Sequence, residues 1–227
     1  MKNRISAVFI GLLLFSCAQK TVKEERLEPT IELNEELLVE LQRMVEVDQI
    51  AAYIPQGKYV EYSKEEWRSF KDSVFTIHQK RLEEIFKEYG FLGFDLVGEQ
   101  GSSNFWLMVQ HSDHNPDFQK QVLEKMKIEV DEGNAKASNY GFLVDRVRLN
   151  LGGKQLYGTQ VEFNVETAEV FPKSLEDSLH VNERRASIGL QPIEEYLNQM
   201  LEMHFEMNKE RYLAIGISEP QFYEIVE

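Results

Sequence analysis

The sequence predicts a mainly helical domain of the α+β class, with packed helices and one small β-hairpin. Apolar residues recur at helical intervals along most of the chain, and capping residues stand where these stretches begin. Strand-like alternation is confined to one region, residues 155–171. A hydrophobic fraction of 42% in 227 residues is enough for one sizeable core.

The N-terminal half is expected to hold two long helices. Asn34 can cap the first, and apolar side chains recur along it from Leu37 to Val45. Ser63 begins the second with a capping box, because a glutamate stands three residues later, and Gly90 ends it. Both patterns are amphipathic, so each helix should bury one face.

Turns and shorter helices are expected in the middle of the chain. Residues 90–103 are rich in turn-forming residues, and a short helix is predicted at 105–110. Two more helices are predicted at 116–130 and 137–149, because each range carries an apolar stripe and is followed by a glycine-containing turn.

The period of the pattern changes after Gly153. Residues 155–164 alternate in the manner of a strand, and residues 169–171 can pair with them as a hairpin. The helical pattern then returns at 181–188 and 192–209. The sequence therefore predicts helices on both sides of a single hairpin.

An export signal is predicted at the start of the sequence. Lys2 and Arg4 precede an apolar run, residues 5–15, that is shorter than the roughly 20 residues needed to span a membrane. Residues 14–17 (LFSC) then resemble the bacterial lipobox, in which a small residue precedes the cut and the cysteine thiol takes up the lipid.

The domain organisation follows from this signal. We expect residues 1–16 to be a cleaved lipoprotein signal peptide, 17–30 a flexible tether, and 31–227 one domain. Cys17 is the only cysteine, so no disulfide can form within the chain. Lipid on Cys17 would anchor the protein to a membrane of the cell envelope, and the outer membrane is favoured because no aspartate follows the cysteine. The alternative is a chance cysteine in an ordinary signal peptide or membrane helix.

Composition and missing motifs argue against several classes of function. The formal net charge of −14 disfavours nucleic acid as a partner, although the acidic residues are spread out as on an ordinary solvated surface. The sequence has no His-Glu-x-x-His, Gly-x-Ser-x-Gly, P-loop or Cys-x-x-Cys motif. These absences argue against zinc proteases of that type, α/β-hydrolases, P-loop NTPases and thioredoxin-like reductants.

Asp48 is the most informative single position. The apolar stripe of Leu37, Leu41 and Met44 continues onto it, which directs a carboxylate inward. Buried carboxylates are rare unless they are paired. The alternatives are that the helix ends here and leaves Asp48 solvated, or that Asp48 pairs with an arginine to hold the fold.

Polar side chains gather at residues 110–114 (QHSDH), between two predicted helices. His111 is a candidate general base, oriented by a carboxylate such as Asp113 or Asp48, because imidazole titrates near neutral pH. The same groups can instead cap the following helix. His111 and His114 are a further candidate pair for a metal, but no other histidine pair accompanies them, and we predict no cofactor.

Arg146 stands out because basic residues are scarce and its neighbours on the helix are apolar. A partly buried guanidinium there needs a carboxylate such as Asp48 or Asp113, or it can grip an anionic substrate group. We predict that Asp48, His111 and Arg146 form one charge-coupled cluster. His78 continues an apolar stripe, so we interpret it as a core histidine.

Several separated motifs of the chain occur together and in order. They are 109–114 (VQHSDH), 145–147 (DRV), 155–160 (QLYGTQ), 181–185 (VNERR) and 189–192 (GLQP). This set resembles a bacterial domain-of-unknown-function family, number 6624, over about residues 33–203. The family has no assigned activity, so the resemblance implies only that these polar segments converge in one pocket.

Two functions are compatible with these observations. One is an enzyme, with hydrolysis as the favoured reaction, or a site for a small ligand. The other is a non-catalytic envelope lipoprotein whose polar residues fix helix packing and whose surface binds a protein partner. The candidate site residues are Asp48, Gln110, His111, Asp113, Arg146, Tyr157 and Gln160, with Arg184 or Arg185 at the rim of the site. If these side chains meet in an open cleft, the enzyme or ligand-binding function is favoured. If they are fully paired with one another in a closed core, the non-catalytic function is favoured.

Overall fold

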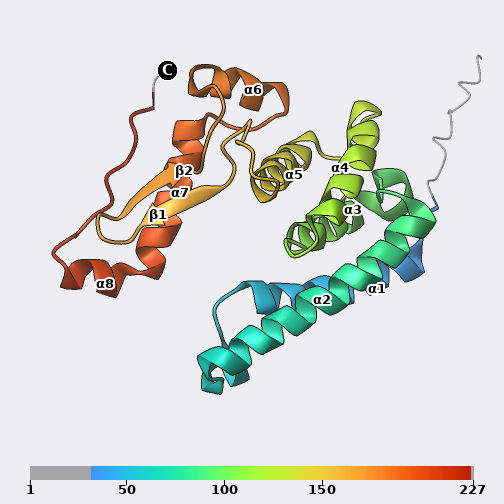
Figure 1. Cartoon of the computed structure of the whole chain (residues 1–227), viewed down its shortest axis with the longest axis horizontal. Helices are drawn as coiled ribbons and strands as arrows, with labels where there is room; N and C mark the ends of the chain where they lie inside the picture. Colours follow the sequence, from blue (N-terminus) through green and yellow to red (C-terminus); the bar gives the residue numbers. More distant parts are fainter. Residues whose placement is uncertain (1–31, 226–227) are drawn as a thin grey trace, which may run out of the picture. The chain divides into compact units, whose positions relative to one another are not determined.

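Residues 32–225 are described by the computed structural model, and within them the chain forms eight α-helices and one two-stranded hairpin (Figure 1). The predicted mainly helical fold is confirmed. The expected signal peptide, Cys17 and the tether to residue 30 lie outside the described residues. No helix in the described range has the length and apolarity to cross a membrane.

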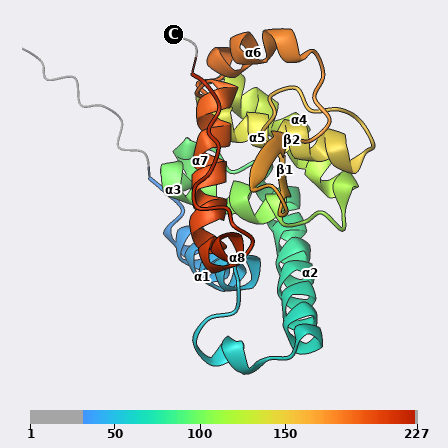
Figure 2. The same ribbon diagram turned by 90° about the vertical axis from the view of Figure 1, so that its left-hand side faces the viewer.

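Helices α1 (Glu35–Ala52) and α2 (Lys64–Tyr89) pack side by side and are connected through the short 3-10 helix η1 (Gly57–Glu61) (Figures 1 and 2). The predicted caps are present. The Asn34 side chain accepts an amide hydrogen bond of 3.0 Å, and Ser63 forms the capping box. Local sequence signals therefore set the start of both helices.

Helix α3 (Phe94–Gln110) corrects the expectation of turns up to residue 103. Gly98 has φ +64° and kinks the helix, but the residues after it are helical. Gly101 and Ser102 are buried, and a Cβ on Gly101 would lie 2.7 Å from the Leu38 side chain of α1. The small residues in this range, which suggested turns, instead allow α3 to pack closely against α1.

Helices α4 (Pro116–Asp131) and α5 (Ala137–Asn150) follow the prediction and pack against each other. Together with α1, α2 and α3 they enclose the main hydrophobic core. Its completely buried members include Leu41, Leu82, Phe105, Met126 and Leu143. Burial of these large side chains is the main force that holds the five helices together.

The hairpin consists of β1 (Val161–Asn164) and β2 (Glu169–Pro172), which pair antiparallel. The first strand is shorter than the predicted 155–164. Residues 155–160 leave the strand pattern because they wrap around a buried carboxylate, described below.

The C-terminal part contains η2 (Ser178–His180), α6 (Val181–Ser187), α7 (Ile193–Met207) and α8 (Lys209–Ala214). Helix α7 lies along strand β2 (Figure 2) and forms a second core with the hairpin. The buried residues of that core are Val170, Val181, Ile193, Leu197 and Leu201. The sequence pattern does not predict α8 as a separate helix, because one helix is expected over 192–209.

Candidate functional site

Asp48 and His111 form a hydrogen-bonded pair at the centre of the candidate site. The Nδ1 atom of His111 lies 2.6 Å from Oδ2 of Asp48. The Asp48 side chain is 1% exposed, whereas the His111 side chain is 20% exposed. The carboxylate is thus enclosed by protein while the imidazole remains partly open to solvent. The structure brings the predicted inward acid and the predicted base together.

Packing of α1, α2 and α3 holds this pair in place. Asp48 continues the buried stripe of α1, between Val45 and Ala51, which are also buried. His111 follows the last residue of α3, and its ring packs against Phe75 of α2 with 5.2 Å between ring centroids. Asp48 is thus held within the helical core, and His111 is held at its edge by contact with α2.

His78 is the third member of this site, although the sequence analysis interpreted it as an ordinary core histidine. Its Nδ1 atom lies 3.7 Å from Oδ1 of Asp48, and its side chain is 12% exposed. Neither of these two atoms has a hydrogen-bond partner among residues 32–225. Asp48 therefore lies between two imidazoles. The apolar stripe of α2 predicts burial of His78 but gives no sign of this neighbour.

Two opposing effects act on the pKa of Asp48. Burial raises the pKa, while the hydrogen bond from His111 and the proximity of His78 lower it, and the pKa lies below the ordinary value of 3.8. Asp48 is therefore ionised at neutral pH. An ionised carboxylate beside Nδ1 favours the tautomer in which His111 carries a proton on Nδ1 and can accept one at Nε2.

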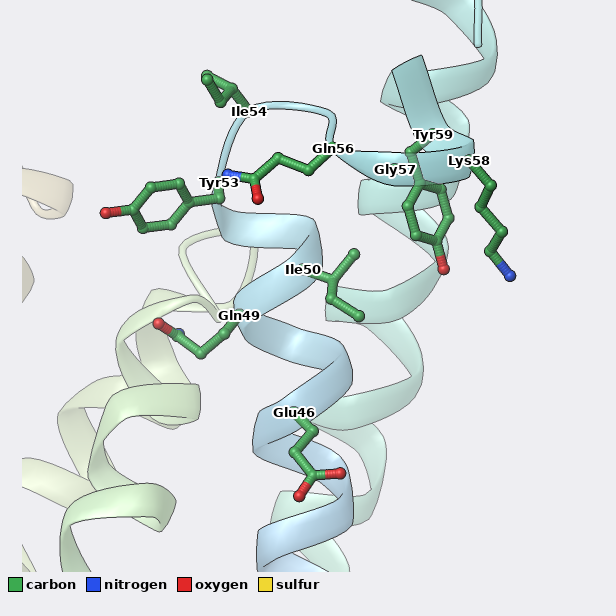
Figure 3. Close-up of a pocket in the computed structure, with 9 residues that line it drawn as sticks. All are labelled: Glu46, Gln49, Ile50, Tyr53, Ile54, Gln56, Gly57, Lys58 and Tyr59. Atoms are coloured by element: carbon green, nitrogen blue, oxygen red, sulfur yellow. The ribbon is translucent and has the colours of Figure 1, made fainter. Parts of the chain in front are cut away.

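A groove of about 520 Å³ opens where α1 ends and η1 begins (Figure 3). Gln49 and Tyr53 extend from one side of α1, and Ile50 extends from the other side, where Tyr59 lies. Gln49 also donates a hydrogen bond of 3.3 Å to Oδ2 of Asp48. One wall residue of the groove therefore contacts the same carboxylate oxygen as His111. The apolar lining consists of Ile50, Tyr53, Ile54 and Tyr59.

Asp113 and Arg146 form a second cluster. The Nη1 atom of Arg146 donates to Oδ2 of Asp113 at 2.7 Å, and Asn150 and Gln119 donate to Oδ1 at 2.9 and 3.0 Å. The predicted single cluster around Asp48 is therefore wrong for Arg146, whose carboxylate partner within the described chain is Asp113. The reason is that α5 packs along α4, and Asp113 lies in the turn just before α4.

Asp145 is completely buried and holds residues 155–160 in place. Its Oδ1 atom accepts hydrogen bonds from the amides of Leu156 and Tyr157, at 2.7 and 3.0 Å. Its Oδ2 atom accepts from the amide and the hydroxyl of Thr159, both at 2.9 Å. The motifs at residues 145–147 and 155–160 thus meet through the carboxylate of Asp145, which has a structural role. Sequence reasoning missed this role because the four donors lie 11 to 14 residues away from Asp145.

Arg184 and Arg185 support the same loop. Arg184 donates to the Leu156 carbonyl at 2.7 Å, and Arg185 donates to the Tyr157 carbonyl at 2.6 Å. Arg185 is 1% exposed and lies over the ring of Tyr196, and burial lowers its pKa. It is therefore not at the rim of an open site, where the sequence analysis placed it. The hydrogen bonds from both arginines stabilise the backbone of residues 156 and 157.

The remaining predicted residues are distributed around these networks. Gln110 ends α3 with a buried side chain, and its carbonyl accepts a hydrogen bond from Gln119 at 3.2 Å. The Tyr157 ring is partly buried, which raises the pKa of its hydroxyl, and Gln160 lines a small cleft. His114 is exposed, and nowhere in residues 32–225 do three His, Cys, Asp or Glu side chains gather as metal ligands.

The sequence of the chain was compared with models of known protein families. A family model described as "Family of unknown function (DUF6624)" matches residues 35–209. The chain belongs to this family. The DUF6624 match covers α1 through α7, so it includes Asp48, His78, His111, Arg146 and the loop around Asp145. Neither the comparison with curated proteins nor that with solved structures finds a match.

Proposed function

We propose that this protein is a hydrolase in which His111 is the general base and Asp48 orients it. The observation that carries the proposal is the 2.6 Å contact between a buried carboxylate and Nδ1 of a partly exposed imidazole. A general base needs a free nitrogen near solvent and a partner that stabilises its protonated form. Asp48 supplies that partner.

The chemistry assigned to the pair is activation of water. Nε2 of His111 takes a proton from a water molecule while the water oxygen attacks the electrophilic centre of the substrate. The imidazolium is stabilised by the Asp48 carboxylate, and it then returns the proton to the leaving group. His78, on the other side of the carboxylate, helps to keep Asp48 ionised, because its proximity lowers the pKa of that group.

The groove at the end of α1 is the proposed site for an apolar part of the substrate. Ile50, Tyr53 and Ile54 line it and are 41%, 55% and 58% exposed, which is unusual for a run of large apolar side chains. Gln49 connects this groove with the pair through its hydrogen bond to Asp48. A substrate with an apolar portion beside a hydrolysable bond suits this arrangement.

The second candidate function is non-catalytic binding of an envelope protein. The same exposed apolar residues favour it, because contiguous exposed apolar surface is typical of protein interaction sites. In that case the Asp48–His111 pair would only stabilise the helical packing. Catalytic turnover that depends on His111 distinguishes the two functions.

The location of either function is proposed to be the surface of a membrane, with the outer membrane favoured. The support is the sequence LFSC at residues 14–17, which resembles a lipobox after a short apolar run. Lipid on Cys17, followed by a polar tether, would hold the helical domain at the membrane surface.

The lipid anchor predicts a change in fractionation. In a bacterial host, Cys17→Ser should move the protein from the membrane fraction to the soluble precursor or secreted fraction, because the thiol that accepts diacylglycerol is gone. Intact-mass spectrometry of the wild-type protein should find acyl chains on an N-terminal Cys17. A wild-type protein without acyl mass would contradict the assignment.

Hydrolysis is tested with a panel of chromogenic carboxylic and phosphoric esters that carry short or long apolar groups. We expect at least one ester to be cleaved, and His111→Asn to lower kcat/KM about 100-fold or more, the usual contribution of a general base. The matched control is His114→Asn, which changes an exposed histidine of the same turn. Absence of turnover for every ester, or equal rates for wild type and His111→Asn, would favour the non-catalytic function.

A further inference from the structure

A small cleft lies between α5, the turn after α3 and the two segments that flank the hairpin. Its volume is about 270 Å³, and it is lined by Asp113, Arg146, Leu149, Asn150, Gln160 and Lys173. We propose that this cleft binds a small oxyanion group, the phosphate or carboxylate of a larger ligand. The inference goes beyond the proposed hydrolytic function and does not depend on it.

The charge of the cleft differs from that of the protein as a whole. Arg146 and Lys173 contribute two positive charges and Asp113 one negative charge, in a chain whose formal net charge is −14. A concave site with low-dielectric walls strengthens the local field. The cleft is therefore a place where an acidic protein can attract an anion.

Asp113 orients the arginine and, among residues 32–225, occupies only one of its nitrogen atoms. Both oxygens of Asp113 already accept hydrogen bonds, one from Arg146 and the other from Asn150 and Gln119. The negative charge of Asp113 is thus largely compensated by protein donors. The contact with Asp113 restricts the orientation of the guanidinium, which lowers the entropy lost when an anion binds.

Arg146 has more hydrogen-bonding capacity than its contacts within the described residues use. A guanidinium carries five N–H donors, and its Nη1 atom contacts Asp113. Its Nε atom is buried and has no hydrogen-bond partner in the described part of the chain. Oxyanions are the groups that a guanidinium binds best, through charge-assisted hydrogen bonds.

The wall of the cleft that Gln160 and Lys173 form is held in place by Gln155, which is completely buried. Its Nε2 atom donates to the carbonyls of Gln160 and Lys173 at 2.8 and 2.9 Å, and its Oε1 atom accepts from the Gln160 amide at 2.7 Å. These bonds hold the segments before β1 and after β2 together. They place Lys173, which is exposed, on the same cleft as Arg146.

The binding site is tested by isothermal titration of the protein with inorganic phosphate and with acetate, at constant ionic strength set with chloride. We expect saturable binding of at least one of the two anions to one site. Lys173→Met and Arg146→Met should each weaken that binding about tenfold or more, because each removes a charged hydrogen-bond donor. Preference for phosphate indicates a phosphorylated ligand, and preference for acetate indicates a carboxylate.

Two controls keep the test specific. Arg148→Met and Lys136→Met remove the same charges from positions outside the cleft and should bind the anion as the wild type does. Lys173→Met is informative even if Arg146→Met does not fold, because Lys173 is exposed. Binding of neither anion, or undiminished binding by Lys173→Met, would overturn the proposal.

Discussion

Asp48→Asn is expected to lower the rate of the His111-dependent hydrolysis about 100-fold or more. Asparagine is neutral, so it stabilises the imidazolium of His111 much less than the carboxylate does. Its amide can also donate to Nδ1 of His111, which selects the tautomer that has no free base at Nε2. The measurement is kcat/KM as a function of pH on the ester that the wild type cleaves.

The fold of Asp48→Asn should be retained. Oδ1 of Asp48 has no hydrogen-bond partner among the described residues, and it lies 3.7 Å from Nδ1 of His78. In the other orientation of the asparagine, which keeps its oxygen near His111, the NH₂ group takes the place of Oδ1 and can donate to Nδ1 of a neutral His78. Asp117→Asn, which changes an exposed acid on α4, is the control. A rate for Asp48→Asn within threefold of this control would remove Asp48 from the mechanism.

The pH dependence of stability gives the same variant a second, independent readout. The pKa of Asp48 is lowered in the folded protein, so its ionised form stabilises the fold above the unfolded-state value of 3.8. That contribution is lost as the pH falls through the lower pKa of the folded state. Below about pH 4 the wild type should therefore lose more stability than Asp48→Asn in urea unfolding.

Asp145→Ala is expected to reduce the free energy of unfolding by at least about 3 kcal/mol, because it removes a completely buried acceptor of four hydrogen bonds. The donors are three backbone amides and the hydroxyl of Thr159, and none of them can turn to solvent without moving residues 155–160. Such a loss is a substantial fraction of the roughly 5–15 kcal/mol that typically stabilises a domain. Urea unfolding measures it directly.

Two further variants isolate the cause of this loss. Asp145→Asn preserves the size of the side chain but directs an NH₂ group at amide donors, so it should also be destabilising. Asp131→Ala removes an exposed aspartate that pairs with Lys127 and should unfold at nearly the wild-type urea concentration. If Asp145→Ala unfolded together with this control, the carboxylate would have no structural role.

The sequence by itself determined the helices and one half of the candidate site. Caps at Asn34 and Ser63 and the apolar periodicity are local features, and they set where α1 and α2 begin. The same periodicity predicted that Asp48 points inward, because a helix fixes the direction of every side chain once its stripe is known. The position of His111 in a polar helix junction marked it as a candidate base.

Only the tertiary structure decided which of these groups meet. His78 and Asp48 belong to different helices, and their proximity depends on how α1 and α2 pack. Arg146 pairs with Asp113 because α5 lies along α4, and Lys173 reaches the same cleft through the Gln155 hydrogen bonds. The periodicity of apolar residues predicts whether a side chain is buried, since burial is a property of one helix face. It does not predict which side chain a buried polar group contacts, because that partner comes from a distant segment and depends on the packing of the whole domain.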